Sequence, residues 1–177
     1  ARVDYGAVID FKVEMLTRAE RRFADGADEA ERAALAAFEA GHAAWLDDYA
    51  LFMALKDAHA GRPWADWAPP LRDRDPDALA RAGDEHAEAM RRHRTWQYWF
   101  HRHWLDVKAH ANDAGIQVIG DLPIFIAYDS ADAWANRELF FFGDDGAPTV
   151  VAGVPPDYFS DTGQRWGNPL YRWKRMQ

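Results

Sequence analysis

The sequence contains no cysteine among its 177 residues. Without thiols it has no disulfide framework, no thiolate metal site and no cysteine nucleophile. It also has no uninterrupted apolar run approaching the roughly 18 residues of a membrane helix. No signal peptide is expected either. We therefore expect a cytoplasmic protein that does not enter a membrane.

Positive charge is scarce as well. Against 29 Asp and Glu the chain carries 21 Lys and Arg, which gives a formal net charge of -8. Phosphate backbones are bound by clusters of Lys and Arg, so nucleic acid is not expected as the main partner. The 7 histidines lack the i, i+4 spacing of a helical zinc site, and no HExxH motif is present. We therefore expect these histidines to be solvated or structural and not metal ligands.

The chain is instead rich in apolar and aromatic residues, with 49% hydrophobic residues and 9 tryptophans. Apolar residues at helical spacing predict helices over most of residues 1–60, with a break at Asp25-Gly26 and another at Gly41-His42. Four prolines predict an irregular connection over residues 61–83, and a long helix is expected from there to about Ala114.

An aromatic stripe runs along this last helix. Its members recur at i, i+3, i+4 and i+8, which places them on one helical face: Trp96, Trp99, Phe100 and Trp104. At this spacing core packing is the better interpretation, with a ligand platform as the alternative. Gly115 is expected to end the helix as a left-handed cap.

The pattern then changes to that of a short strand, residues 116–119, followed at once by Asp121. A helix, a glycine and a strand form the αβ half of a βαβ unit, and such folds keep their active sites just beyond the strands. Asp121 is therefore a candidate functional carboxylate, and a turn-capping aspartate is the alternative. Farther on, residues 129–134 predict a short capped helix and residues 139–151 a hairpin with an Asp-Gly turn.

Residues 153–170 combine turn residues with aromatic side chains. Flat aromatic rings suit the C–H faces of sugars, and Asp157 and Asn168 offer partners for hydroxyl groups. The segment thus predicts either a site for a polyhydroxylated ligand or a loop folded on its own apolar side chains.

Two motifs resemble those of the 4-alpha-glucanotransferases (amylomaltases or disproportionating enzymes, glycoside hydrolase family 77). The first is Gly-Asp-Leu-Pro-Ile-Phe-Ile-Ala at 120–127 with Asp-Ser-Ala-Asp at 129–132 and Trp-Ala-Asn at 134–136. The second is Val-Pro-Pro-Asp-Tyr-Phe-Ser at 154–160 with Trp-Gly-Asn-Pro-Leu-Tyr at 166–171. Residues 4–9 also look like the family's entry to its helical insertion, and residues 10–115 match mainly in helical character.

The resemblance implies an α/β fold, a partial (β/α)8 TIM barrel with a largely α-helical insertion. Residues 1–115 would form the insertion and a barrel helix, and residues 116–177 a barrel strand with substrate-binding loops. The implied activity is transfer of α-1,4-glucan segments between maltodextrins by a retaining mechanism. The family's Arg-x-Asp-His motif with its nucleophile, and its acid/base, are absent, so we expect an internal fragment that is inactive alone.

The resemblance also implies substrate-binding residues, although it supplies no catalytic residue, cofactor or metal ligand. Residues 157–159 match a flexible loop over the glucan, and two further positions match its groove near the cleavage point. One more position matches an aspartate near the active-site end of its strand, where it can accept sugar hydroxyls. In chain order the six are Asp121 (strand end), Asp157, Tyr158 and Phe159 (loop), and Trp166 and Asn168 (groove). Two other classes stay open from the residues alone. One is a non-catalytic carbohydrate-binding module, and the other is a helical interaction protein that docks a partner on its aromatic stripe.

Overall fold

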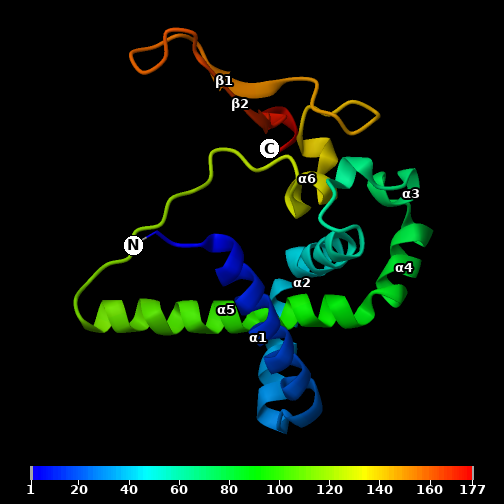
Figure 1. Cartoon of the computed structure of the whole chain (residues 1–177), viewed down its shortest axis with the longest axis vertical. Helices are drawn as coiled ribbons and strands as arrows, with labels where there is room; N and C mark the ends of the chain where they lie inside the picture. The colour runs from blue at the N-terminus through cyan, green and yellow to red at the C-terminus, as the bar shows by residue number, and fades with distance from the viewer. Residues whose placement is uncertain (1, 177) are drawn as a thin grey trace. The chain divides into compact units, whose positions relative to one another are not determined.

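The computed structural model describes residues 2–176, which divide into two units. The helical unit holds the chain up to Ala50 together with residues 87–119, and the hairpin unit holds residues 51–86 and the chain from Gly120 on. Figure 1 traces the elements of both.

The helical unit is built from α1 (Tyr5–Gly26), most of α2 (Glu29–Ala58) and α5 (Ala87–Asp113). After the predicted break at Asp25-Gly26, α2 begins with a reciprocal cap. The backbone N–H of Glu31 donates to the Asp28 carboxylate over 2.8 Å, and the N–H of Asp28 donates to the Glu31 carboxylate over 3.2 Å. The predicted break at Gly41-His42 is wrong, because α2 continues through it. One glycine inside a helix costs only about 1 kcal/mol, which packing elsewhere on the helix offsets.

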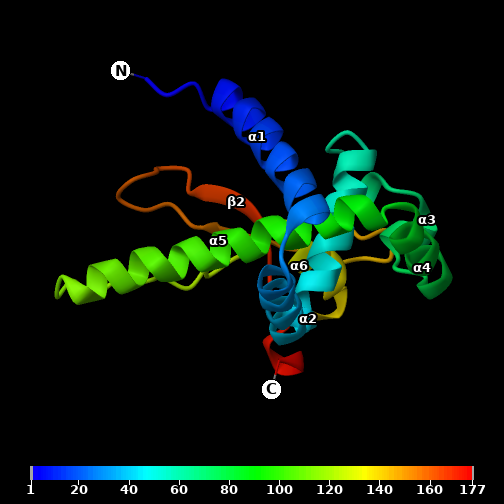
Figure 2. The same cartoon turned by 90° about the horizontal axis from the view of Figure 1, so that it is seen from below.

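The core of this unit consists of Phe38, Leu46 and Tyr98, with partly buried side chains packed against them from Leu35, Tyr49 and Trp99. Helix α1 packs across α5 (Figure 2), where the ring of Phe23 meets the edge of Trp99 at 5.7 Å. A buried carboxylate of α1, that of Glu20, accepts from the Arg91 guanidinium over 2.9 Å.

The prediction that the aromatic stripe of α5 is core is wrong for half of its members. Phe100 and Trp104 are exposed, and Trp96 and Trp99 are partly buried. The buried side chains of α5 are instead those of Met90, His93, Thr95 and Tyr98. The two exposed members lie toward the C-terminal half of α5, where residues 102–110 are all exposed, so no described element covers this part of the helix. Helical spacing identifies a common face but not how far along the helix that face is covered.

The segment after α5 forms no strand. Residues 116–119 are exposed and irregular, and no described residue pairs with them. This corrects the predicted strand, and the reason is physical: a parallel strand exists only beside neighbours that supply its hydrogen bonds. The predicted cap is confirmed, since Gly115 adopts a left-handed φ of 76° and the N–H of Ile116 donates to the carbonyl of Ala111 over 2.9 Å.

The hairpin unit consists of short elements. They are the end of α2, η1 (Trp64–Asp66), α3 (Pro69–Arg72), α4 (Pro76–Glu85), α6 (Ala131–Ala135), η2 (Arg137–Leu139), β1 (Val151–Val154), β2 (Gln164–Pro169) and η3 (Trp173–Arg175). The predicted irregular connection over 61–83 is therefore mostly helical. Its prolines begin helices rather than prevent them, because a first-turn position needs no backbone N–H: Pro69 opens α3 and Pro76 opens α4.

Two fully buried indoles form the core of the hairpin unit. Trp64 donates its ring N–H to the carbonyl of Tyr128 over 2.8 Å, and Trp134 donates its ring N–H to the carbonyl of Leu71 over 3.0 Å. The predicted helix at 129–134 is confirmed as α6, with the Ser130 hydroxyl as its N-cap, which accepts from Ala133 over 3.3 Å. These bonds join residues 64–71 to residues 128–135.

A second link in this unit is ionic. The Asp73 carboxylate accepts from Arg72 over 2.8 and 2.9 Å and from Arg137 over 2.6 Å. The hydrogen bond from Arg72, and next that from Arg137, lower the pKa of Asp73 to about 2. An exposed network of this kind contributes modestly to stability, because solvent screens it.

We expect the thermal stability of the chain to fall at acidic pH, because protonation of Asp73 breaks its network with Arg72 and Arg137. The pKa of Asp73 is lower in the folded than in the unfolded state, where it is about 4. The stabilisation is therefore complete above about pH 4 and is lost as the pH falls toward about 2. Thermal melts followed by circular dichroism between these pH values test this. In Asp73→Asn the melting temperature is expected to depend less on pH in this range. A pH dependence as steep as that of the parent would contradict the prediction.

Candidate functional site

Strands β1 and β2 form an antiparallel hairpin (Figure 1) in the segment for which an irregular loop was the expectation. Val151 pairs with Pro169 and Gly153 with Arg165, so a single residue of β1 faces residues 166–168 of β2. Such a bulge redirects the side chains of its strand. It holds two of the predicted site residues, Trp166 and Asn168, on either side of Gly167, whose φ is 82°.

The tip of the hairpin is shaped by Asp157. Its carboxylate Oδ1 accepts the backbone N–H groups of Phe159 and Ser160, each over 2.9 Å. The Ser160 hydroxyl donates to the carbonyl of Gly163 over 2.7 Å, which closes the loop. Asp157 thus has a turn-forming role in addition to the sugar-binding role predicted for it, and its second carboxylate oxygen is not used by the turn.

This turn presents two aromatic rings to solvent. Tyr158 is 95% exposed and Phe159 is 86% exposed, and their rings meet edge to face at 5.5 Å. The alternative that this loop folds on its own apolar side chains is therefore wrong for its tip. These two adjacent exposed rings make the tip a candidate binding surface.

The bulge is tied to the segment that carries Asp121. The side-chain amide of Asn168 donates to the carbonyl of Ile126 over 2.8 Å, and the ring of Trp166 lies 6.0 Å from that of Phe125. The Trp166 ring N–H donates to the Gln164 side chain over 3.1 Å, and Asp121 lies exposed at the start of the segment. The structure therefore brings Trp166 and Asn168 together with residues 125 and 126. It shows no contact of Asp121 with them in the described residues.

The contacts of Phe125 and Gln164 were not predicted. Phe125 belongs to the first motif, and its position there was the available signal. Nothing in the sequence indicated that Gln164 would hold the Trp166 indole. The Asp-Gly turn predicted within 139–151 is confirmed, since the N–H of Gly143 donates to the carbonyl of Ala147 over 2.9 Å.

We expect the loop between the strands to depend on Gly163. Its φ is 74°, and a Cβ there would lie 2.6 Å from the carbonyl oxygen of Val154 and 2.9 Å from the carbonyl carbon of Pro155. Both are backbone atoms that cannot move aside. Gly163→Ala is thus expected to destabilise the hairpin unit by at least ~1–2 kcal/mol, the usual left-handed penalty. Urea unfolding measures it, with Gly120→Ala as control because a Cβ there meets no atom within 4 Å. Equal midpoints for the two variants would contradict the prediction.

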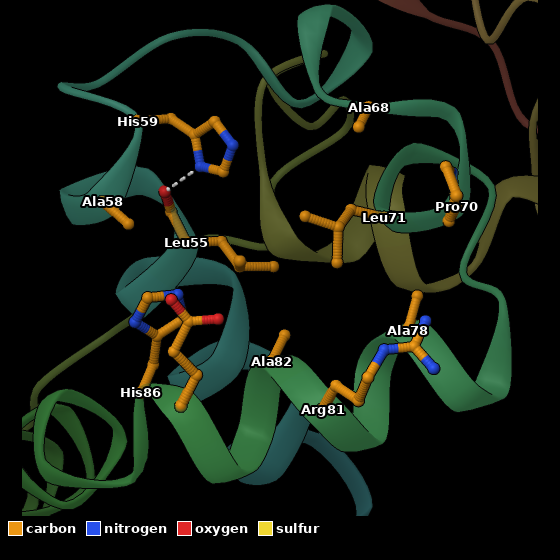
Figure 3. Close-up of a pocket in the computed structure, with 11 residues that line it drawn as sticks. Leu55, Ala58, His59, Ala68, Pro70, Leu71, Ala78, Arg81, Ala82 and His86 are labelled. Atoms are coloured by element: carbon orange, nitrogen blue, oxygen red, sulfur yellow. Dashed lines mark hydrogen bonds between the residues drawn. The ribbon is translucent and has the colours of Figure 1, made fainter.

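A pocket in the hairpin unit lies away from these residues. It has a volume of about 400 Å³, and its lining from the end of α2, from α3 and from α4 is mostly apolar (Figure 3). The polar side chains in the lining are those of His59, Arg81, Glu85 and His86. At its edge the imidazole of His59 is hydrogen-bonded to the carbonyl of Leu55 at 2.8 Å and stacks on Trp67. No predicted site residue lines it. The candidate site is therefore the open surface of the hairpin and not this pocket.

The described residues contain no group of three or more His, Asp or Glu side chains placed to hold a metal ion. In residues 2–176 no helix is long and apolar enough to cross a bilayer. What the hairpin offers is binding chemistry, aromatic faces beside carboxylate and amide groups. This is the composition of sites that hold polyhydroxylated ligands.

The comparisons with known proteins agree with this chemistry. The family model of the 4-alpha-glucanotransferases, glycoside hydrolase family 77, matches residues 1–177. The chain belongs to this family, as its two motifs predicted. It is 55% identical over 99% of its length to a 4-alpha-glucanotransferase of Thermus thermophilus and 44% identical, over a similar span, to one of Synechocystis.

The fold has a close counterpart among solved structures. An amylomaltase from Streptococcus agalactiae in complex with acarbose superimposes with a TM-score of 0.90 at 36% sequence identity, over 97% of this chain and 34% of that one. The two relatives named above are each covered over 35% of their length. The chain thus spans about a third of the length of the proteins that it matches.

Proposed function

We propose that the protein containing this chain is a 4-alpha-glucanotransferase that transfers α-1,4-glucan segments between maltodextrins. In the retaining mechanism a carboxylate attacks the anomeric carbon and breaks the glycosidic bond, while a carboxylic acid protonates the leaving oxygen. The acceptor's 4-hydroxyl then gives its proton to that same group and displaces the enzyme carboxylate. Both catalytic groups lie outside this chain in the proposal, and the chain contributes to substrate binding.

The observation that carries the proposal is the pair of exposed rings at the hairpin tip, Tyr158 and Phe159, in a chain that belongs to this family. Exposed aromatic surface is costly in water unless a ligand covers it. We propose that these two rings fold over the bound glucan. Covering the glucan excludes water, which favours a sugar acceptor over hydrolysis. The acarbose bound to the solved relative supports a maltodextrin-like ligand.

Each of the other predicted site residues has its own proposed contact with the glucan. Trp166 would lie against a sugar ring, because half of its surface is free. Asn168 uses its amide nitrogen for the carbonyl of Ile126, which leaves its side-chain oxygen to accept a sugar hydroxyl. Asp121 and the second oxygen of Asp157 would accept further hydroxyls.

The fold proposed for the complete protein is the (β/α)8 barrel, with residues 116–119 as one of its strands once neighbouring strands supply their hydrogen bonds. Support comes from the apolar character of this segment, whose side chains are exposed here, Ile119 almost completely. A cytoplasmic location remains a prediction from the cysteine-free composition.

Glucose release from maltotriose tests the function. The complete gene product is expected to release glucose and to form longer maltodextrins, whereas the isolated 177-residue chain is expected to do neither. Glucose release by the isolated chain would show that the catalytic groups are inside it. A complete gene product that binds maltodextrin without any transfer would favour the carbohydrate-binding module.

A further inference from the structure

Lys56, near the end of α2, is a cation whose ammonium group makes three hydrogen bonds within the protein. Its ammonium group donates to the carbonyls of Gly61 and Arg62, over 2.6 and 2.9 Å, and to the Asp129 carboxylate over 2.6 Å. An ammonium has three N–H donors, so these contacts saturate it. Its side chain is only 15% exposed. Such a group holds its neighbours in fixed positions, unlike a solvated surface lysine.

The partner of Lys56 is bonded on both oxygens. While Oδ2 of Asp129 accepts from Lys56, Oδ1 accepts from the backbone N–H of Trp64 over 3.3 Å. The buried Trp64 ring donates to the carbonyl of Tyr128, and the Tyr128 hydroxyl donates to the carbonyl of Gly146 over 2.9 Å. Residues 128 and 129 are thereby fixed to the end of α2 and to the buried indole.

Residues 128 and 129 end the segment that carries the candidate site. Two residues before Tyr128 the carbonyl of Ile126 accepts from Asn168, and next to it Phe125 contacts Trp166. The preceding residues 120–124 are all exposed. The course of the segment therefore depends on attachments at its end: at Ile126 from the bulge of β2, at Tyr128 from Trp64 and Gly146, and at Asp129 from Lys56 and Trp64. Among these, Lys56 supplies the charged one.

We propose that Lys56 is a positioning residue for the glucan site, which acts through Asp129 to fix residues 120–129 against the bulge of β2. This inference rests on the proposed function. Lys56 touches no glucan in the proposal. Its effect passes through the segment that presents Asp121 and supports Asn168 and Trp166. Loss of the cation also leaves the Asp129 carboxylate, whose side chain is 35% exposed, without its counter-charge, which loosens the segment further.

The test replaces Lys56 by methionine in the complete gene product, which keeps the aliphatic stem and removes the charge. We expect the Kd for acarbose and the KM for maltotriose to rise roughly tenfold, with a smaller change in kcat. Amide hydrogen exchange in residues 120–129 should become faster. Arg94→Met is the matched control: it removes a cation that donates to Asp47 over 2.8 and 3.1 Å in the helical unit, and it should leave Kd, KM and exchange unchanged.

A double variant separates positioning from stability. Lys56→Met with Asp129→Asn has no uncompensated carboxylate, so we expect thermal stability to recover in part while the Kd for acarbose stays raised. Recovery of the Kd together with stability would overturn the proposal, and so would an unchanged Kd and unchanged exchange in Lys56→Met. A parent protein without transferase activity would instead refute the proposed function. The exchange data would then still decide whether Lys56 fixes the segment.

Discussion

Trp166→Ala in the complete gene product is expected to lower kcat/KM for maltotriose by roughly 10–30-fold, with little loss of thermal stability. The Trp166 ring is 49% exposed, and its contacts are an edge-to-face approach to Phe125 and one hydrogen bond to Gln164. Truncation therefore removes little buried surface. If the ring lies against a sugar, the lost apolar contact is worth about 2 kcal/mol, which corresponds to this range of kcat/KM.

The matched control is Trp104→Ala on α5, because Trp104 is also a half-exposed indole, with 45% of its surface free. This variant should leave kcat/KM unchanged. Michaelis–Menten kinetics and thermal melts on the same preparations supply the comparison. A collapse of thermal stability with unchanged kinetics per folded molecule would make Trp166 a core residue, and a loss of activity shared by both variants would remove the special role of Trp166.

Trp64→Ala is expected to have the largest effect on folding, about 3–5 kcal/mol of the free energy of unfolding. The indole is fully buried among Tyr128 and Phe142, and Gly146 approaches so closely that a Cβ there would lie 3.0 Å from the ring. Truncation would leave a cavity beside an unpaired Tyr128 carbonyl. Since many domains are stable by only ~5–15 kcal/mol, this loss is severe.

A conservative change at the same position separates the contribution of packing from that of the ring N–H hydrogen bond. Trp64→Phe keeps most of the bulk but removes the ring N–H that bonds to Tyr128, so it should cost about 1–3 kcal/mol. Urea unfolding of the 177-residue chain, followed by circular dichroism, measures both variants. An alanine variant that loses less than the phenylalanine variant would show that packing of the indole is not what stabilises the unit.

Features with local causes were predictable from the sequence. The reciprocal cap at Asp28 and Glu31, the Ser130 cap of α6 and the left-handed Gly115 each involve atoms a few residues apart. The family motifs were likewise readable, because each is a continuous run of residues. The family membership followed from them, and the segments that carry them remain candidates for the site.

Features that depend on distant residues were not predictable. The bulge of β2 lies at Gly167 and Asn168, residue types that disfavour strands, and it forms because β1 pairs on both sides of it. The packed face of α5 is chosen by α1 and α2 and not by its own spacing. Lys56 has no sequence signal, since its carboxylate partner lies 73 residues away.

The two units are built from alternating segments of the chain, which determines how they can be separated for expression. The helical unit takes the chain up to Ala50 and then residues 87–119, and the hairpin unit takes residues 51–86 and then the chain from Gly120 on. The contributions alternate, so no single cut of the polypeptide separates one unit from the other. A truncation at Leu51, for example, would remove α1 and most of α2 and leave α5 without its partners. Isolating the hairpin unit for expression would require excision of residues 87–119 and a linker across the junction.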